Sequence, residues 1–194
     1  MKITEVLDVQ SRGPWRAWLR KNHATAKEIW LVYYRAESGR KRIPYSDAVE
    51  EALCYGWIDS TVKKLDRDRF VQRFSPRKKN SGLSEMNKER IRRLIKTGKM
   101  TRVGMEGIRH HLTKNLTAAA GTSTLKPFPF PRDILSVLKE DEVVWKNYSR
   151  FPAHYRRIRI AWIDGARKRP AEFKKRLRYF VRMTAQNKKF GMIQ

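Results

Sequence analysis

In the first third of the chain, segments whose apolar residues have helical spacing are followed by segments with the composition of a strand. Trp15, Trp18 and Leu19 stand at positions i, i+3 and i+4 among basic residues, and Pro14 suits a first helical turn. We therefore predict a short amphipathic helix in this segment. The run at residues 29–34, Ile-Trp-Leu-Val-Tyr-Tyr, is β-branched and aromatic, which is typical of a buried strand.

A second helix is predicted over residues 45–56. Asp47, followed by Glu50 three residues later, is an N-terminal capping pattern, and Gly56 is a suitable C-terminal stop. The apolar positions of this stretch fall on one side of the predicted helix, and they are Val49, Ala52 and Leu53.

Alternation of apolar and polar residues then predicts a hairpin. Residues 57–65 and 69–74 have the composition of two strands, and residues 66–68, Asp-Arg-Asp, connect them. Pro76 ends the second strand because proline has no backbone N–H for a ladder. Beyond the hairpin, the apolar spacing predicts two helices within residues 81–112.

Residues 115–130 are small, nearly uncharged and rich in proline at their end, which is typical of a linker. The rest of the chain contains only helical spacing. We predict an α+β fold with a small antiparallel sheet and flanking helices in an N-terminal domain, residues 1–114. A linker, residues 115–127, leads to a small all-helical C-terminal domain, residues 128–194.

The excess of basic residues predicts the kind of partner that this protein binds. The 194 residues include 45 Lys+Arg and 19 Asp+Glu, a formal net charge of +26, and 40% are hydrophobic, which predicts a packed core. Residues 60–99 carry 14 basic and 4 acidic side chains, and residues 146–190 carry 15 and 2. Since two blocks hold almost all of the excess, we expect a polyanionic partner, either nucleic acid or an acidic protein surface.

The first basic block alternates cations with aromatic residues, an arrangement that suits single-stranded nucleic acid by pairing phosphates and stacking bases. Its candidate anion-binding residues are Lys63, Lys64, Arg69, Arg73, Arg77 and Lys78. Those of the second block are Arg156, Arg157, Arg159, Lys174 and Arg178. The alternative is that both blocks are solvated surfaces and that the aromatic residues belong to the core.

A candidate pocket comprises Cys54, Trp57 and Asp59, with Arg73 beside it. Cys54 is the single cysteine, so it has no partner for a disulfide within the chain, and in an enzyme it would be the nucleophile. The structural alternative is favoured, because a helix C-terminus disfavours a thiolate and free cysteine is usually buried. Asp59 is expected to anchor an ion pair rather than to act as a general base, because basic residues surround it.

The sequence contains no pattern for a metal or a cofactor. The histidines His23, His110, His111 and His154 lack metal-ligand spacing, and no glycine-rich nucleotide loop occurs. We expect neither a metal nor a cofactor. The sequence shows no secretory signal and no apolar run of membrane-spanning length, so we expect a cytoplasmic protein.

Several motifs together resemble a known family. In the N-terminal part they are Trp15–Leu19, Asn22-His23, Ile29–Leu31, the run Tyr45–Ser60 with Glu-Ala-Leu-Cys-Tyr-Gly-Trp-Ile-Asp-Ser at its end, Gln72–Lys78, Ser81, Asn87 and Gly98–Met100. At these positions, and from Phe151 through Trp162 to Lys189, the chain is similar to the YdeI/OmpD-associated proteins. The resemblance implies a small helical domain associated with bacteriocin protection, tolerance of cationic antimicrobial peptides and a link to an outer-membrane porin. It implies no reaction, cofactor or catalytic residue.

We therefore predict a non-enzymatic, stress-linked protein of this type that engages anionic partners through the two basic blocks. So positive a chain would repel cationic peptides within the roughly 8–10 Å over which charges act at physiological salt. Any protection would then be indirect, by occupying the same anionic targets. Two alternatives stay open: an enzyme with a pocket around Cys54 and Asp59, and a protein–protein adaptor that docks an acidic partner on its C-terminal helices.

Overall fold

The computed structural model describes residues 2–79, 81–114 and 123–191. The chain divides into two compact units, the first made of residues 1–82 and 90–125 and the second of residues 83–89 and 126–194. The predicted α+β fold class is confirmed, since a sheet with helices is followed by a part in which every described element is a helix.

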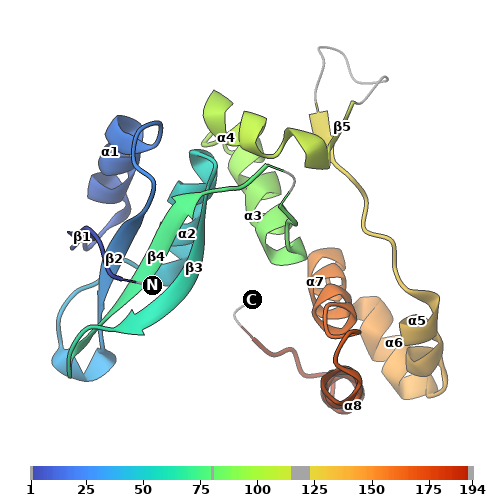
Figure 1. The fold of residues 1–194 in the computed structure, drawn as a ribbon. Helices are drawn as coiled ribbons and strands as arrows, with labels where there is room; N and C mark the ends of the chain where they lie inside the picture. Colours follow the sequence, from blue (N-terminus) through green and yellow to red (C-terminus); the bar gives the residue numbers. More distant parts are fainter. Residues whose placement is uncertain (1, 80, 115–122, 192–194) are drawn as a thin grey trace. The chain divides into compact units, whose positions relative to one another are not determined.

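The sheet of the first unit has the strand order β1-β2-β4-β3 (Figure 1). Its strands are β1 (Val6–Leu7), β2 (Ile29–Tyr34), β3 (Trp57–Lys64) and β4 (Arg69–Pro76). β2, β4 and β3 are antiparallel neighbours as predicted, whereas β1 runs parallel to β2, so the sheet is mixed. The predicted hairpin joins β3 to β4.

Two helices, α1 (Arg12–Asn22) and α2 (Tyr45–Cys54), pack on one face of this sheet. Trp15 of α1 meets Phe74 of β4 edge-on, with 5.4 Å between ring centroids, and stacks on Trp18, which in turn contacts Trp57. Removal of these rings from water, at about 25 cal/mol per Å² of apolar surface, is a main source of stability for this layer. Its largest fully buried side chains are Trp15, Leu19, Ile29, Leu31, Leu53, Trp57 and Phe74.

The bounds of α2 agree with the prediction to within two residues, but the capping of its first turn differs from it. The helix begins at Tyr45, and no side chain caps its first turn. The predicted capping by Asp47 and Glu50 is wrong, because Arg12 of α1 donates to both carboxylates, at 2.8 and 2.7 Å. Gly56, the predicted stop, has a φ of +73°, a conformation that glycine adopts without strain.

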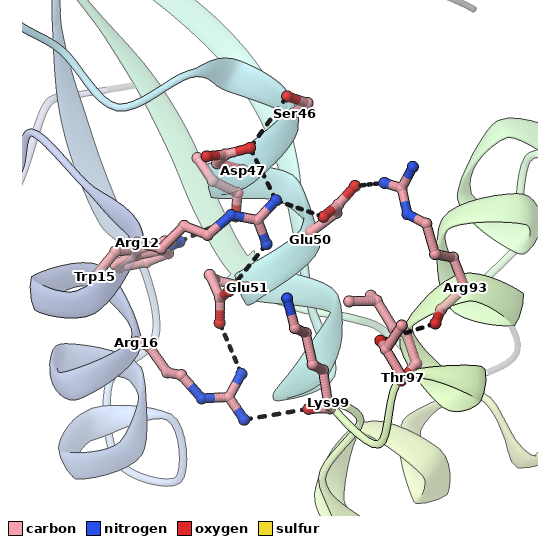
Figure 2. Close-up of polar contacts among 12 residues, drawn as sticks. Arg12, Trp15, Arg16, Ser46, Asp47, Glu50, Glu51, Arg93, Thr97 and Lys99 are labelled. Atoms are coloured by element: carbon pink, nitrogen blue, oxygen red, sulfur yellow. Dashed lines mark hydrogen bonds and ion pairs between the residues drawn. The ribbon is translucent and has the colours of Figure 1, made fainter. Parts of the chain in front are cut away.

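A group of three carboxylates and three arginines joins α1 and α2 to the second half of α3 (Glu85–Lys96), as Figure 2 shows. We call it the carboxylate–arginine network, and it consists of Arg12, Arg16, Asp47, Glu50, Glu51 and Arg93. Glu51 accepts hydrogen bonds from Arg12 at 3.2 Å and from Arg16 at 2.7 Å, and Glu50 pairs with Arg12 and Arg93. Both glutamates are buried, so this double pairing compensates for the loss of their hydration.

The segment after α3 contains shorter elements than predicted. They are α4 (Arg102–Gly107), the 3-10 turn η2 (Arg109–His111) and the strands β5 (Leu112–Lys114) and β6 (Ser123–Leu125), which pair antiparallel. Another 3-10 turn, η1 (Ala36–Ser38), lies earlier in the chain, after β2. Of the predicted linker, residues 115–122 lie outside the described residues, and residues 123–125 are strand β6.

Besides the start of α3, the described residues of the second unit form four helices, in agreement with the helical spacing of the sequence. They are α5 (Arg132–Lys139), α6 (Glu142–Arg150), α7 (Ala153–Asp164) and α8 (Pro170–Ala185). Asp141 caps α6 by accepting hydrogen bonds from the backbone of Val143 at 2.8 Å and Val144 at 3.0 Å. The core of the unit includes Ile134, Leu138, Val144, Tyr148, Tyr155, Ile160, Ile163 and Phe180.

Candidate anion-binding groove

A groove of about 1040 Å³ opens in the first unit, between the α2–β3 turn, the end of β4 and α4. We call it the cationic groove. Its lining residues come from four segments that are distant in sequence, and they are His23, Tyr55, Gly56, Trp57, Pro76, Arg77, Lys79, Arg102, Val103, Glu106, Gly107, Arg109 and His110.

The wall of the groove depends on close approach between backbones. Gly104 of α4 packs directly against the end of α2, where an added Cβ would lie 2.7 Å from the carbonyl carbon of Cys54. Gly107 faces Gly56 in the same way, with the Gly56 Cα 3.3 Å from an added Cβ. The Thr101 hydroxyl donates to the carbonyl oxygen of Cys54 and accepts from the Gly104 amide. Small residues at these positions therefore place α4 beside the α2–β3 turn.

Cations dominate the groove. Arg77, Lys79, Arg102 and Arg109 carry four positive charges, and Glu106 is the one carboxylate among the lining residues. Glu106 pairs with Arg109 at 3.5 Å, with both side chains largely exposed, so the pair is weak. Lys79 and Arg102 are exposed and form no hydrogen bond or ion pair with the described residues.

Arg77 is the most constrained of these cations. Its Nη2 donates to the Ser81 hydroxyl at 3.2 Å and to the Gly82 carbonyl at 2.7 Å, while its buried Nε has no partner among the described residues. Burial lowers the pKa of the Arg77 guanidinium, and the nearby carboxylate of Asp59 opposes that shift. A partly desolvated guanidinium with an unsatisfied donor gains from an anion within reach.

The aromatic residues of the groove belong to its floor. Trp57 is buried and donates from Nε1 to the His23 carbonyl at 3.1 Å, and Tyr55 is 7% exposed beneath the guanidinium of Arg16. His110 lies against His111, with 4.0 Å between ring centroids. The rings of Trp57 and Tyr55 are thus too covered to stack on a planar group, and most of the charged side chains that line the groove are cationic.

The candidate pocket of Cys54, Trp57 and Asp59 does not form one site. Cys54 is fully buried behind the groove wall, and burial raises the pKa of its thiol. Trp57 lines the groove, but Asp59 does not. The geometry favours the structural alternative for Cys54, since a buried thiol with a raised pKa is a poor nucleophile.

Asp59 belongs to strand β3, and its carboxylate accepts a hydrogen bond from the Tyr45 hydroxyl at 2.7 Å. Burial, together with this bond to a carboxylate, raises the pKa of Tyr45 to about 12. The buried hydroxyl of Tyr33 has no partner among the described residues, and burial raises its pKa as well. No ion pair of Asp59 occurs within 4 Å in the described part of the chain, although its charge acts on Arg77 and Arg90.

The first basic block does not converge on the groove. Arg69 is paired with Asp66 at 2.6 Å and Arg73 with Glu28 at 2.7 Å, so both charges are largely neutralised. Lys63 lies over the Trp30 ring. Lys64 and Lys78 are exposed and do not line the groove, which leaves Arg77 as the one candidate of this block that does.

The second basic block is also divided among several roles. Arg157 pairs with Glu89 at 3.0 Å, Arg156 lies over the Tyr148 ring, and Arg159 is 7% exposed among aromatic rings. Lys174 is exposed, and Arg178 lines a separate pocket on α8. Whether these residues bind an anion stays a prediction.

The sequence did not single out His23, Arg102, Arg109 or His110 as binding residues, although all four line the groove. Arg102 and Arg109 lie in a stretch with almost balanced charge, so a count of charge by block hides them. The signal that could have found them is the pair Gly104 and Gly107, because small residues one turn apart on a short helix predict close packing.

Two further properties of the described residues concern metals and membranes. The described part of the chain contains no cluster of three or more histidine, cysteine or acidic side chains that could hold a metal ion. None of its helices combines the length and the apolar character that a membrane span requires.

The fold and the groove define an α+β domain with a cationic surface site, joined to a helical domain. The chain belongs to the family described as domain of unknown function DUF8412, whose family model matches residues 7–107, just over half of the chain. Residues 127–187 match the model described as bacteriocin-protection, YdeI or OmpD-associated, so the predicted resemblance is confirmed for the C-terminal part of the chain. No curated protein and no solved structure matches this chain.

Proposed function

We propose that this protein binds single-stranded nucleic acid by its phosphate backbone in the cationic groove of the first unit. The observation that carries this proposal is Arg77, a partly buried guanidinium that lines a groove with three further cations. An extended chain of phosphates would supply the negative charge that the groove lacks.

Two features of the groove favour a phosphate backbone over base recognition. Tyr55 and Trp57 are covered, so base stacking contributes little. The free cations Lys79 and Arg102 are exposed on flexible stems, which suits point contacts to successive phosphates rather than a fixed pattern of base edges. Binding is therefore independent of base sequence.

For the whole chain we propose a stress-linked, non-enzymatic role in the cytoplasm. The description of the model that matches residues 127–187 includes bacteriocin protection. The net charge of +26 disfavours direct capture of a cationic peptide. In this proposal the protein protects by occupying the anionic targets that a cationic peptide would otherwise contact.

A salt titration tests the proposed binding. Fluorescence anisotropy of a labelled oligo-dT measures affinity between low and physiological salt. Engagement of the four groove cations predicts a slope of log affinity against log salt of about −3, at roughly −0.7 per phosphate. Submicromolar affinity near physiological salt supports the proposal. Loss of binding above low salt, or equal competition by poly-glutamate, would contradict it.

A further inference from the structure

The second unit has a basic pocket of its own, of about 650 Å³, against α7 and α8. Its cations are Lys175, Arg176, Arg178 and Arg182, and Glu172 is its one acidic lining residue. Glu172 forms an ion pair with Arg176 at 2.7 Å, so its negative charge compensates that of Arg176. Three positive charges are left without a counter-charge among the lining residues.

Two guanidinium groups of this pocket lie on aromatic rings. Arg176 lies 4.7 Å from the centre of the Trp162 ring, and Arg182 lies 5.3 Å from the centre of the Tyr179 ring. A ring beneath a guanidinium restricts its motion, and the N–H edge of Arg182 has no partner in the described part of the chain. Arg176 is further fixed by donating to the Trp162 carbonyl at 2.7 Å.

The rings of Trp162 and Tyr179 pack against further side chains of the second unit. Phe190 meets Tyr179 edge-on with 4.7 Å between centroids and Trp162 with 5.8 Å. Arg159 is buried beneath the same rings, 4.4 Å from the centre of Phe190, and burial lowers the pKa of its guanidinium. The floor of the pocket is therefore packed, and the pocket is preorganised before a ligand arrives.

The remaining cations follow one side of α8. Lys175, Arg178 and Arg182 stand at i, i+3 and i+7, so they lie in a row that rises about 10 Å along the helix, at 1.5 Å per residue. Lys175 and Arg178 are exposed and form no hydrogen bond or ion pair with the described residues. A row of cations at this spacing matches a ligand with several negative groups in sequence.

We propose that this pocket binds an oligophosphate, a compact ligand with two or more linked phosphoryl groups. Planar guanidinium edges pair with phosphoryl oxygens in a bidentate manner, and lysine adds a point charge. A single phosphate is too short to contact all three cations of the row on α8. The site and its ligand are independent of the nucleic acid binding proposed for the first unit.

Tripolyphosphate titrated into the full-length protein tests this inference, with indole N–H resonances as the readout. The resonance missing from Trp162→Phe identifies Trp162 among the six tryptophans. We expect tripolyphosphate to shift the Trp162 resonance and to bind at least tenfold more tightly than inorganic phosphate. ATP in a parallel titration shows whether a nucleoside adds to the affinity of the phosphate chain.

Matched variants separate this site from general attraction to charge. Lys175→Gln with Arg178→Gln should weaken tripolyphosphate binding at Trp162 about tenfold or more, which equals about 1.4 kcal/mol or more. Lys174→Gln with Arg150→Gln removes the same charges from exposed positions outside the pocket and should change affinity less than threefold. Lys79→Glu with Arg102→Glu, in the cationic groove, should leave the Trp162 response intact. An unshifted Trp162 resonance, or equal losses in both glutamine pairs, would overturn the inference.

Discussion

Gly104 lies directly against the carbonyl group of Cys54, with no room for a side chain between α4 and the end of α2. This contact brings the segment that carries Arg102 and Arg109 into the lining of the groove, to which Arg77 also belongs. The position of α4, and with it the shape of the groove, therefore depends on Gly104 rather than on the charged residues.

Substitution of Gly104 by alanine should destabilise the protein by about 1–3 kcal/mol, the usual range for forcing an extra carbon into a packed site. Urea unfolding followed by circular dichroism measures this. Gly13→Ala is the matched control, because Gly13 has nothing within 4 Å of an added Cβ and lies in α1. That change should be neutral or stabilising, by up to about 1 kcal/mol. A Gly104→Ala variant as stable as the wild type would show that α4 is not held as described.

Cys54 should react slowly with iodoacetamide in the native protein. The thiol is fully buried and burial raises its pKa, so little thiolate is exposed to the reagent. Mass spectrometry after timed quenching should show labelling at least 100-fold slower than in denaturant. Fast stoichiometric labelling of the folded protein would contradict this prediction and support the alternative of an enzyme with Cys54 as its nucleophile.

The carboxylate–arginine network should contribute to stability through its buried members. Glu51→Gln leaves Arg12 and Arg16 with a neutral partner, and we expect a loss of about 1–3 kcal/mol in the free energy of unfolding. Asp47→Asn removes one contact to Arg12 at a more exposed position and should cost less. If the two variants lose equal stability, burial of Glu51 does not set the strength of its ion pairs.

Glu28 should make stability depend on pH in acid. Hydrogen bonds from Thr4 and Arg73 lower the pKa of its carboxyl below the ordinary value. A lowered folded-state pKa means that the unfolded chain takes up the proton first. The contribution of Glu28 is therefore complete above about pH 5 and is lost as pH falls through about 4.3 toward the folded-state pKa.

The variant Glu28→Gln should accordingly lose about 1 kcal/mol at pH 6 and less at pH 3.5. Urea midpoints at the two pH values measure the difference. Glu37→Gln is the control, because Glu37 is exposed and bonds to no described residue. An equal loss at both pH values would contradict the role given to the Glu28 carboxylate.

Local pattern predicted most of the helices and strands, because each has its own apolar period or turn residue. Gly56 marked the end of α2 correctly, and the hairpin at residues 66–68 was found from composition. β1 was missed because two residues that pair with a distant strand leave no period in the sequence. The capping pattern at Asp47 failed because Arg12, 35 residues away, takes the carboxylate.

The candidate site was less predictable than the fold. Charge counts identified basic blocks, but they cannot tell a paired arginine such as Arg73 from an unpaired cation such as Arg102. The distinction depends on which acidic residue the fold brings close, and that is a long-range property. Arg77 was found by both approaches because it lies in a basic block and also lines the groove.

The most direct measurement compares two charge reversals of equal size for binding of labelled oligo-dT at physiological salt. Lys79→Glu with Arg102→Glu changes two exposed cations of the groove, and Lys64→Glu with Arg67→Glu changes two exposed cations on the β3–β4 hairpin. We expect a loss of about 30-fold or more for the groove pair, at roughly 1 kcal/mol for each of the two lost phosphate contacts. The hairpin pair should lose less than threefold. Equal losses for the two pairs would show that net charge alone attracts nucleic acid and that the cationic groove is not its binding site.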